Sequence, residues 1–143
     1  MRTMIRVLLA DDHEIVRQGV TALLGFEPDM EVVGGADGGQ QALDLVCRLS
    51  PDVLVTDIEM PGYSGIRLCA EIRHRRLPTR CIILSMHSAE EFIHGAFRAG
   101  ARGYVAKERS VDHLAKAIRE VASGGRYLSP HLPISLSQIP EPA

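Results

Sequence analysis

Five short apolar segments, each followed by a longer segment of helical periodicity, succeed one another along this chain of 143 residues. The apolar segments span residues 5–10, 31–35, 53–56, 80–85 and 103–106, and we expect each to form a strand. The segments that follow them, residues 13–24, 39–49, 66–76, 89–99 and 111–123, carry apolar side chains on one helical face. Parallel strands need crossover connections, which such helices supply. The alternation therefore predicts an α/β fold with a five-stranded parallel sheet and helices on both faces.

The composition is typical of a single globular domain, with 45% hydrophobic and 24% charged residues. The net charge of −2 argues against a surface devoted to nucleic acid or another polyanion. The apolar runs are far shorter than the ~20 residues of a membrane span, and we expect no secretory signal. The three cysteines form no CxxC pair, so we expect neither zinc nor a disulfide framework, and we place the protein in the reducing cytoplasm.

The end of the chain differs in composition from the rest. Residues 128–143 contain four prolines and no lysine or arginine, whereas residues 1–127 hold all five strand–helix units. Proline-rich termini of this kind are usually extended and only loosely attached to a domain. We therefore expect one domain over residues 1–127 and a tail or linker over residues 128–143.

Carboxylate, hydroxyl and ammonium groups stand at the ends of four expected strands. Asp11 and Asp12 follow the first strand, Asp57 follows the third, Ser85 ends the fourth and Lys107 follows the fifth. Such sheets carry their sites at the carboxyl ends of the strands, where these side chains would meet. Clustered carboxylates repel unless a cation joins them, and oxygen ligands are typical of Mg²⁺.

A magnesium ion, a lysine and a hydroxyl together suit the oxygens of a phosphoryl group, and a carboxylate beside them can act as the nucleophile. The competing interpretation is structural, because an aspartate such as Asp12 often only caps the helix that follows it. The joint placement of these groups after four strands favours a site for a metal ion and a phosphoryl group over the structural interpretation.

Four stretches of the chain resemble the receiver domain of two-component response regulators, in the NarL/FixJ (LuxR-type) group. They are LLADDH at residues 8–13, TDIEMPG at residues 56–62, ILSMH at residues 83–87 and AGARGYVAK at residues 99–107. The resemblance covers residues 4–127. It implies a flavodoxin-like receiver fold with the strand order 2-1-3-4-5.

The resemblance also implies roles for the aspartates at the strand ends and for Glu59. Asp57 would be the phosphoacceptor, which takes a phosphoryl group from a sensor histidine kinase. Asp12, Asp57 and the backbone carbonyl of Glu59 would bind Mg²⁺ directly, and Asp11 would reach the ion through water. The chain would therefore be a phospho-switch in a signal-transducing phosphorelay, taking part in its own phosphorylation and dephosphorylation, rather than an enzyme.

Further residues receive roles in the same way. Ser85 would hydrogen-bond a phosphoryl oxygen, Lys107 would pair with the phosphoryl group, and Tyr104 would turn inward as Ser85 moves. Glu59 and His87 lie where side chains screen the acyl phosphate from water and so set its lifetime.

Two positions depart from the family pattern. Glu108 stands where proline usually follows the lysine, so we expect a rearranged loop after Lys107. Met86 stands where a small residue usually follows Ser85, and we expect it to crowd the phosphoryl pocket.

Control of transcription is the expected output, through a DNA-binding domain that this chain lacks. Sixteen residues follow Tyr127, too few for a helix-turn-helix domain. The chain would be either a receiver fragment of a longer transcription factor or a stand-alone receiver that acts by protein–protein contact. Two competing functions are those of an aspartyl-phosphate phosphatase and of a flavodoxin-type cofactor binder.

Phosphorylation is expected to favour a homodimer, through the first and last helices or through the face around the fourth helix, fifth strand and last helix.

Overall fold

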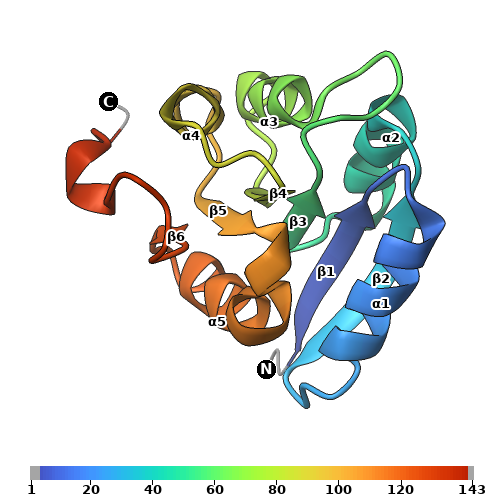
Figure 1. The fold of residues 1–143 in the computed structure, drawn as a ribbon. Coiled ribbons are helices and arrows are strands. Elements are labelled where there is room, and N and C mark those ends of the chain that lie inside the picture. Colours follow the sequence, from blue (N-terminus) through green and yellow to red (C-terminus); the bar gives the residue numbers. More distant parts are fainter. Residues whose placement is uncertain (1–3, 142–143) are drawn as a thin grey trace.

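Six parallel strands form the central sheet of the computed structural model, which describes residues 4–141 (Figure 1). The order across the sheet is β2-β1-β3-β4-β5-β6. The strands are β1 (Ile5–Ala10), β2 (Met30–Ala36), β3 (Val53–Thr56), β4 (Arg80–Ser85), β5 (Gly103–Ala106) and β6 (Tyr127–Leu128). All neighbouring pairs are parallel, so the carboxyl ends of the strands lie at one edge of the sheet.

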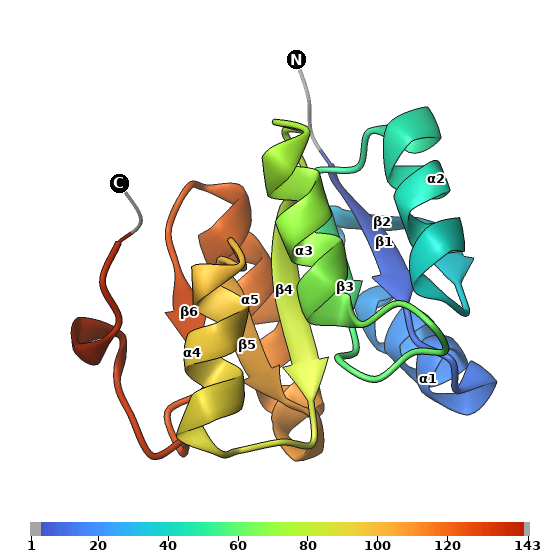
Figure 2. The same ribbon diagram turned by 90° about the horizontal axis from the view of Figure 1, so that it is seen from above.

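Five helices cover the two faces of the sheet. They are α1 (Glu14–Leu24), α2 (Gly39–Leu49), α3 (Gly65–His74), α4 (Glu90–Arg98) and α5 (Ser110–Ala122). Helices α1 and α5 lie on one face, and α2, α3 and α4 lie on the other (Figures 1 and 2). Within residues 4–141, no helix is long and apolar enough to cross a membrane.

Two apolar cores explain why the strand sequences are apolar without interruption. Successive side chains of a strand point to opposite faces, and both faces of this sheet are covered. In β1, Val7 and Leu9 pack under α1 and α5, whereas Leu8 packs under the helices of the other face. In β4, Ile82 and Ile83 divide in the same way. A polar residue within these strands would therefore be buried on either face.

The sheet corrects the expected strand number. The prediction of five strands in the order 2-1-3-4-5 is confirmed for those five, but a sixth strand, β6, pairs with β5. The pairing joins Gly103 to Tyr127 and Tyr104 to Leu128. A two-residue strand is too short for an apolar periodicity, so nothing in the sequence pattern predicts it. Strand β5 therefore has a neighbour on both edges.

The segment after β6 packs against the domain, although its composition predicts a tail or linker. Leu128, Ile134 and Ile139 are buried and belong to the apolar core on the face of the sheet that α2, α3 and α4 cover. The Arg126 guanidinium donates to the carbonyl oxygens of Leu136 and Ile139, at 3.4 and 3.0 Å. Apolar side chains spaced between the prolines hold the segment down, and composition averages conceal that spacing. A role as a linker stays a prediction.

We predict that Ile139→Ala lowers the free energy of unfolding by about 2 kcal/mol, because it deletes buried methyl groups at the end of this segment. The matched control is Ile15→Ala. Ile15 is 82% exposed on α1, so its truncation is expected to change stability by less than about 0.5 kcal/mol. Chemical denaturation of the full chain measures both values. Equal effects of the two variants would show that residues 129–141 do not pack on the domain.

Candidate functional site

Three carboxylates meet at the carboxyl end of the sheet. Asp11 and Asp12 follow β1, and Asp57 follows the neighbouring strand β3. The ladder hydrogen bonds continue past the strands, because the Asp57 N–H donates to the Ala10 carbonyl at 2.9 Å and the Asp11 N–H to the Ala36 carbonyl at 3.0 Å. Asp11 and Asp57 are buried, and Asp12 is exposed. The sheet itself therefore fixes the backbones that carry the two buried carboxylates.

Lys107 compensates part of this negative charge. Its Nζ lies 3.0 Å from Asp11 Oδ2 and 3.2 Å from Asp57 Oδ2. Burial lowers the pKa of the Lys107 ammonium, but the carboxylates of Asp11 and Asp57 outweigh it, so this pKa lies above its ordinary value. Lys107 is therefore a cation held between two acids, as its position after the fifth strand predicts.

Asp57 remains short of positive charge despite this partner. Burial raises the pKa of the Asp57 carboxyl, the Lys107 ammonium lowers it, and the charge of Asp11 raises it again, with a net rise above the ordinary value. The Ile58 N–H donates to Asp57 Oδ1 at 2.8 Å. A carboxylate whose charged form is disfavoured in this way is stabilised by any further cation that reaches it.

His13 joins the cluster, although the sequence pattern does not predict a role for it. Its Nδ1 lies 3.0 Å from Asp11 Oδ1 and 3.1 Å from Asp12 Oδ1, and its N–H donates to Asp11 Oδ1 at 2.8 Å. Spacing does not distinguish it from the other histidines, since none has metal-ligand spacing with another. Its adjacency to Asp12 in the sequence is the signal that could have identified it.

The donor set fits a hard divalent cation. One ligand atom from each of Asp11, Asp12, His13 and Asp57 lies within 4.8 Å of the others. Three of these groups are carboxylates, and a single ammonium leaves the cluster with net negative charge. Mg²⁺ binds through oxygen ligands of this kind and keeps several waters, which suits a cluster that is partly exposed.

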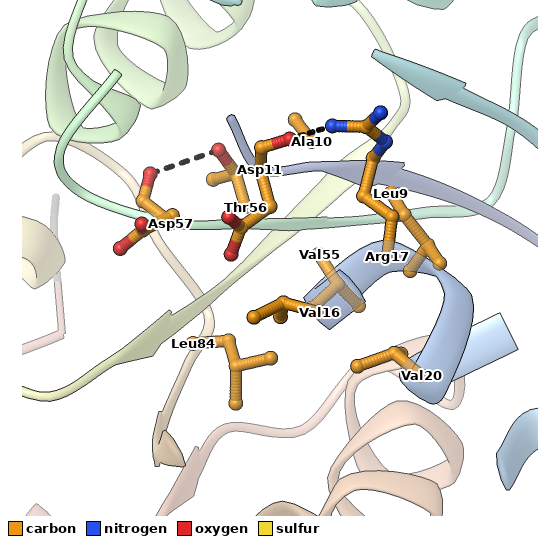
Figure 3. A pocket seen from close by; sticks show the side chains of 10 residues that line it. All are labelled: Leu9, Ala10, Asp11, Val16, Arg17, Val20, Val55, Thr56, Asp57 and Leu84. Carbon is orange, nitrogen blue, oxygen red and sulfur yellow. Dashed lines mark hydrogen bonds between the residues drawn. The ribbon is translucent and has the colours of Figure 1, made fainter. Parts of the chain in front are cut away.

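A narrow pocket lies beside the cluster, between the ends of the strands and α1. Figure 3 shows Asp11 and Asp57 at its polar end, and the apolar side chains of Val16, Val20 and Leu84 along the rest. Arg17 donates a hydrogen bond from its guanidinium to the Asp11 carbonyl. Asp11 and Asp57 therefore lie beside apolar side chains, which limits how water can screen their charges.

The other expected residues lie at the end of β4 (Ser85), in β5 (Tyr104) and in the β4–α4 loop (His87). Ser85 is fully buried, and its Oγ accepts a hydrogen bond from the His87 N–H at 3.0 Å. The Tyr104 ring is also fully buried, and its hydroxyl donates to the His87 carbonyl at 2.7 Å. Burial raises the pKa of Tyr104 and outweighs its hydrogen bond to Ser85. These contacts tie the end of β4 to β5.

A side-chain contact joins this loop to the β3–α3 loop. His87 Nε2 lies 2.5 Å from Glu59 Oε1, and the His87 ring stacks on Phe92 with centroids 4.2 Å apart. The Glu59 side chain is 76% exposed, so the contact lies at the rim of the site. The role of the Glu59 backbone carbonyl as a metal ligand stays a prediction.

The two departures from the family pattern have different outcomes. Met86 is 77% exposed, so the expectation that it crowds the pocket is wrong: its side chain extends into solvent. After Lys107 the chain forms a 3₁₀ turn over Lys107–Arg109, and no peptide bond between residues 4 and 141 is cis. This turn at Glu108 coexists with a Lys107 that reaches both acids, and a rearrangement relative to the family pattern stays a prediction.

Close backbone contact fixes the loop between Asp57 and α3. A Cβ atom at Gly65 would lie 1.9 Å from the Asp57 carbonyl oxygen, far inside contact distance. The Gly65 N–H donates to the Ile58 carbonyl at 2.8 Å. Two residues before Gly65, the Tyr63 ring occupies the space where a Cβ at Gly39 would lie, 2.4 Å from its nearest atom. Sequence periodicity gives no sign of such contacts.

We predict that Gly65→Ala lowers the free energy of unfolding by about 2 kcal/mol and weakens Mg²⁺ binding, because the new methyl group displaces the Asp57 backbone. Gly19→Ala is the matched control. It adds the same methyl group within α1, where nothing lies within 4 Å, and is expected to stabilise the helix by up to about 1 kcal/mol. Thermal unfolding and calorimetric Mg²⁺ titration report the two effects. A Gly65→Ala variant that matches Gly19→Ala in both would refute the close approach of this loop to Asp57.

Known proteins resemble this chain over most of its length. Residues 7–119 match the family of the response regulator receiver domain. The DNA-binding transcriptional activator DevR/DosR of Mycobacterium tuberculosis is 40% identical over 125 residues, which cover 87% of this chain and 58% of that protein. The transcriptional regulatory protein UhpA of Salmonella typhimurium is 40% identical over 134 residues, covering 94% of this chain and 67% of that protein. The chain thus spans roughly three fifths of the length of these two relatives.

Solved structures agree with the fold. The signal receiver domain of the response regulator NarL from M. tuberculosis has a TM-score of 0.82 at 36% identity, covering 85% of this chain and 98% of that one. A LuxR-family two-component response regulator from Aurantimonas sp. SI85-9A1 has a TM-score of 0.85 at 37% identity, covering 89% of this chain and 91% of that one. The resemblance drawn from the four sequence stretches is confirmed: this chain belongs to the response regulator receiver family, and its relatives are of the NarL/LuxR type.

Proposed function

We propose that Asp57 accepts a phosphoryl group from the phosphohistidine of a sensor histidine kinase. A carboxylate oxygen of Asp57 bonds to phosphorus while the phosphorus–nitrogen bond breaks, and the electron pair stays on the kinase imidazole. The observation that carries the proposal is the Lys107 ammonium, within 3.2 Å of both Asp11 and Asp57. A cation held beside a buried carboxylate is preorganised for the oxygens of the incoming group.

Asp12 and Asp57, the Glu59 carbonyl and, through water, Asp11 are the proposed ligands of Mg²⁺. When bound, Mg²⁺ neutralises the carboxylates, so that an anionic phosphoryl group can approach them. Lys107 then exchanges its carboxylate contacts for contact with phosphoryl oxygen. This exchange explains why a lysine, with a flexible stem and a single charged end, serves here.

The proposed switch couples the new phosphoryl group to the β4–α4 loop. Ser85 gives up the His87 N–H and donates its hydroxyl to a phosphoryl oxygen, which moves the loop that Tyr104 holds through the His87 carbonyl. A ligand shifts such an equilibrium only through contacts that differ between the two states, and this hydrogen bond is one. In this proposal the chain also hydrolyses its own acyl phosphate. The Glu59–His87 contact at the rim hinders the approach of water to the acyl phosphate and so slows this hydrolysis.

The proposed output is control of transcription in the cytoplasm, through a DNA-binding domain outside this chain. Its support is the names of the relatives, which are transcriptional regulators longer than this chain.

We also propose that phosphorylation favours a homodimer, and that α1 forms the interface. The exposed Ile15 lies on α1, whereas β6 and Ser129 hydrogen-bond along the outer edge of β5. Sedimentation with and without beryllofluoride tests this, and equal association in both states would contradict it.

The phosphoacceptor assignment predicts that acetyl phosphate with Mg²⁺ adds one phosphoryl group to the chain, as measured by intact mass. Asp57→Asn is expected to remain unlabelled, because it lacks the nucleophilic carboxylate. Asp12→Ala is expected to lose most labelling through weaker metal binding. The control is Asp44→Asn, which makes the same change at an exposed position of α2 and is expected to label normally. Full labelling of Asp57→Asn would exclude Asp57 as the acceptor.

A further inference from the structure

Ser129, the first residue after β6, bonds to β5 at two points. Its N–H donates to the Tyr104 carbonyl at 3.0 Å, and its Oγ accepts from the Ala106 N–H at 3.0 Å. Ser129 is only 1% exposed, and Ala106 is buried as well. The hydroxyl therefore supplies a buried backbone N–H with its acceptor at the last residue of the strand.

The two residues that Ser129 holds are linked to the site. Ala106 directly precedes Lys107, whose ammonium pairs with Asp11 and Asp57. Tyr104 donates to the carbonyl of His87, in the loop that directly follows Ser85. We propose that Ser129 is a positioning residue for phosphorylation at Asp57, acting through the backbone that carries Lys107. The inference rests on the proposed function of Asp57 and assigns a part in it to the C-terminal segment.

Few other hydrogen bonds hold the backbone at the end of β5 on its β6 side. Strand β5 ends at Ala106, and Lys107 already belongs to the 3₁₀ turn. On the β6 side, the strand pairing covers only Gly103 and Tyr104. The Ser129 hydroxyl thus extends the hydrogen bonding of that edge to the residue before the lysine. Without it, the Ala106 N–H loses its acceptor in a buried position, and the backbone relaxes to find another.

Ser129 is itself held from both sides. Leu128, before it, is paired with Tyr104 and buried. After it, Glu141 accepts from Arg102 at 2.9 Å and lies 3.2 Å from the Arg126 guanidinium. The buried Ile139 anchors the same stretch in the core. The hydroxyl is therefore presented from a fixed segment, as a positioning role requires.

The test compares Ser129→Ala with the wild-type chain for the rate of labelling by acetyl phosphate at saturating Mg²⁺. We expect the rate to fall roughly threefold to tenfold, because the lysine is less well placed for the phosphoryl oxygens. Mg²⁺ affinity is expected to stay the same or rise, because a displaced ammonium competes less for Asp11 and Asp57. A general loss of structure would instead lower rate, affinity and stability together.

Two further variants isolate the hydroxyl. Ser129→Thr keeps the acceptor and is expected to restore the wild-type rate, and Ser129→Cys, with a weaker acceptor of similar size, to give an intermediate rate. Ser123→Ala is the matched control. It removes another hydroxyl that bonds to backbone, 2.8 Å from the Glu120 carbonyl at the exposed end of α5, and should leave the rate unchanged.

The outcomes separate this inference from the proposed function. Labelling of wild type at Asp57 with an unchanged rate in Ser129→Ala would overturn the positioning role alone. A parallel loss of rate, Mg²⁺ affinity and thermal stability in Ser129→Ala and Ser129→Cys would overturn it too, since the residue would then be merely structural. Absence of labelling in the wild-type chain would overturn both proposals.

Discussion

The ion pairs of Lys107 with Asp11 and Asp57 are the interaction on which the rest of the site depends. Two buried carboxylates at adjacent strand ends repel each other, and the ammonium at 3.0 and 3.2 Å offsets part of that cost. Burial, with a smaller contribution from the charge of Asp11, keeps the pKa of the Asp57 carboxyl above its ordinary value despite the Lys107 ammonium. In the proposed function, the same uncompensated negative charge attracts a divalent cation and, once that cation is bound, a phosphoryl group. The stability of the folded chain and the chemistry proposed for the site thus depend on the same arrangement of charges.

Much of the fold could be predicted because its elements are long and periodic. Runs such as Ile5–Ala10 and Arg80–Ser85 are apolar at every position that the two cores require, and their predicted bounds agree with the structure. The meeting of Asp11, Asp57 and Lys107 was predictable for a geometric reason. Once the strands are parallel, residues that follow them must share one edge of the sheet. Their positions after the strands are enough to predict that they lie close together.

The parts that escaped prediction depend on contacts that sequence patterns do not encode. Strand β6 is two residues long, so it has no period, and its existence depends on the free edge of β5. The approach of Gly65 to the Asp57 carbonyl is a property of one loop conformation. His13 resembles any surface histidine until Asp11 and Asp12 are placed around it. Each is a tertiary contact of a short segment, where local propensity says little.

The most direct test of the central claim is calorimetric titration of the chain with Mg²⁺, comparing wild type with Lys107→Ala and Asp57→Asn. If the acids form a cation site that the lysine partly occupies, wild type binds one Mg²⁺. Lys107→Ala then binds it more tightly, because a competing positive charge is gone, and Asp57→Asn binds it more weakly. Failure of wild type to bind Mg²⁺, or weaker binding by Lys107→Ala, would contradict the account.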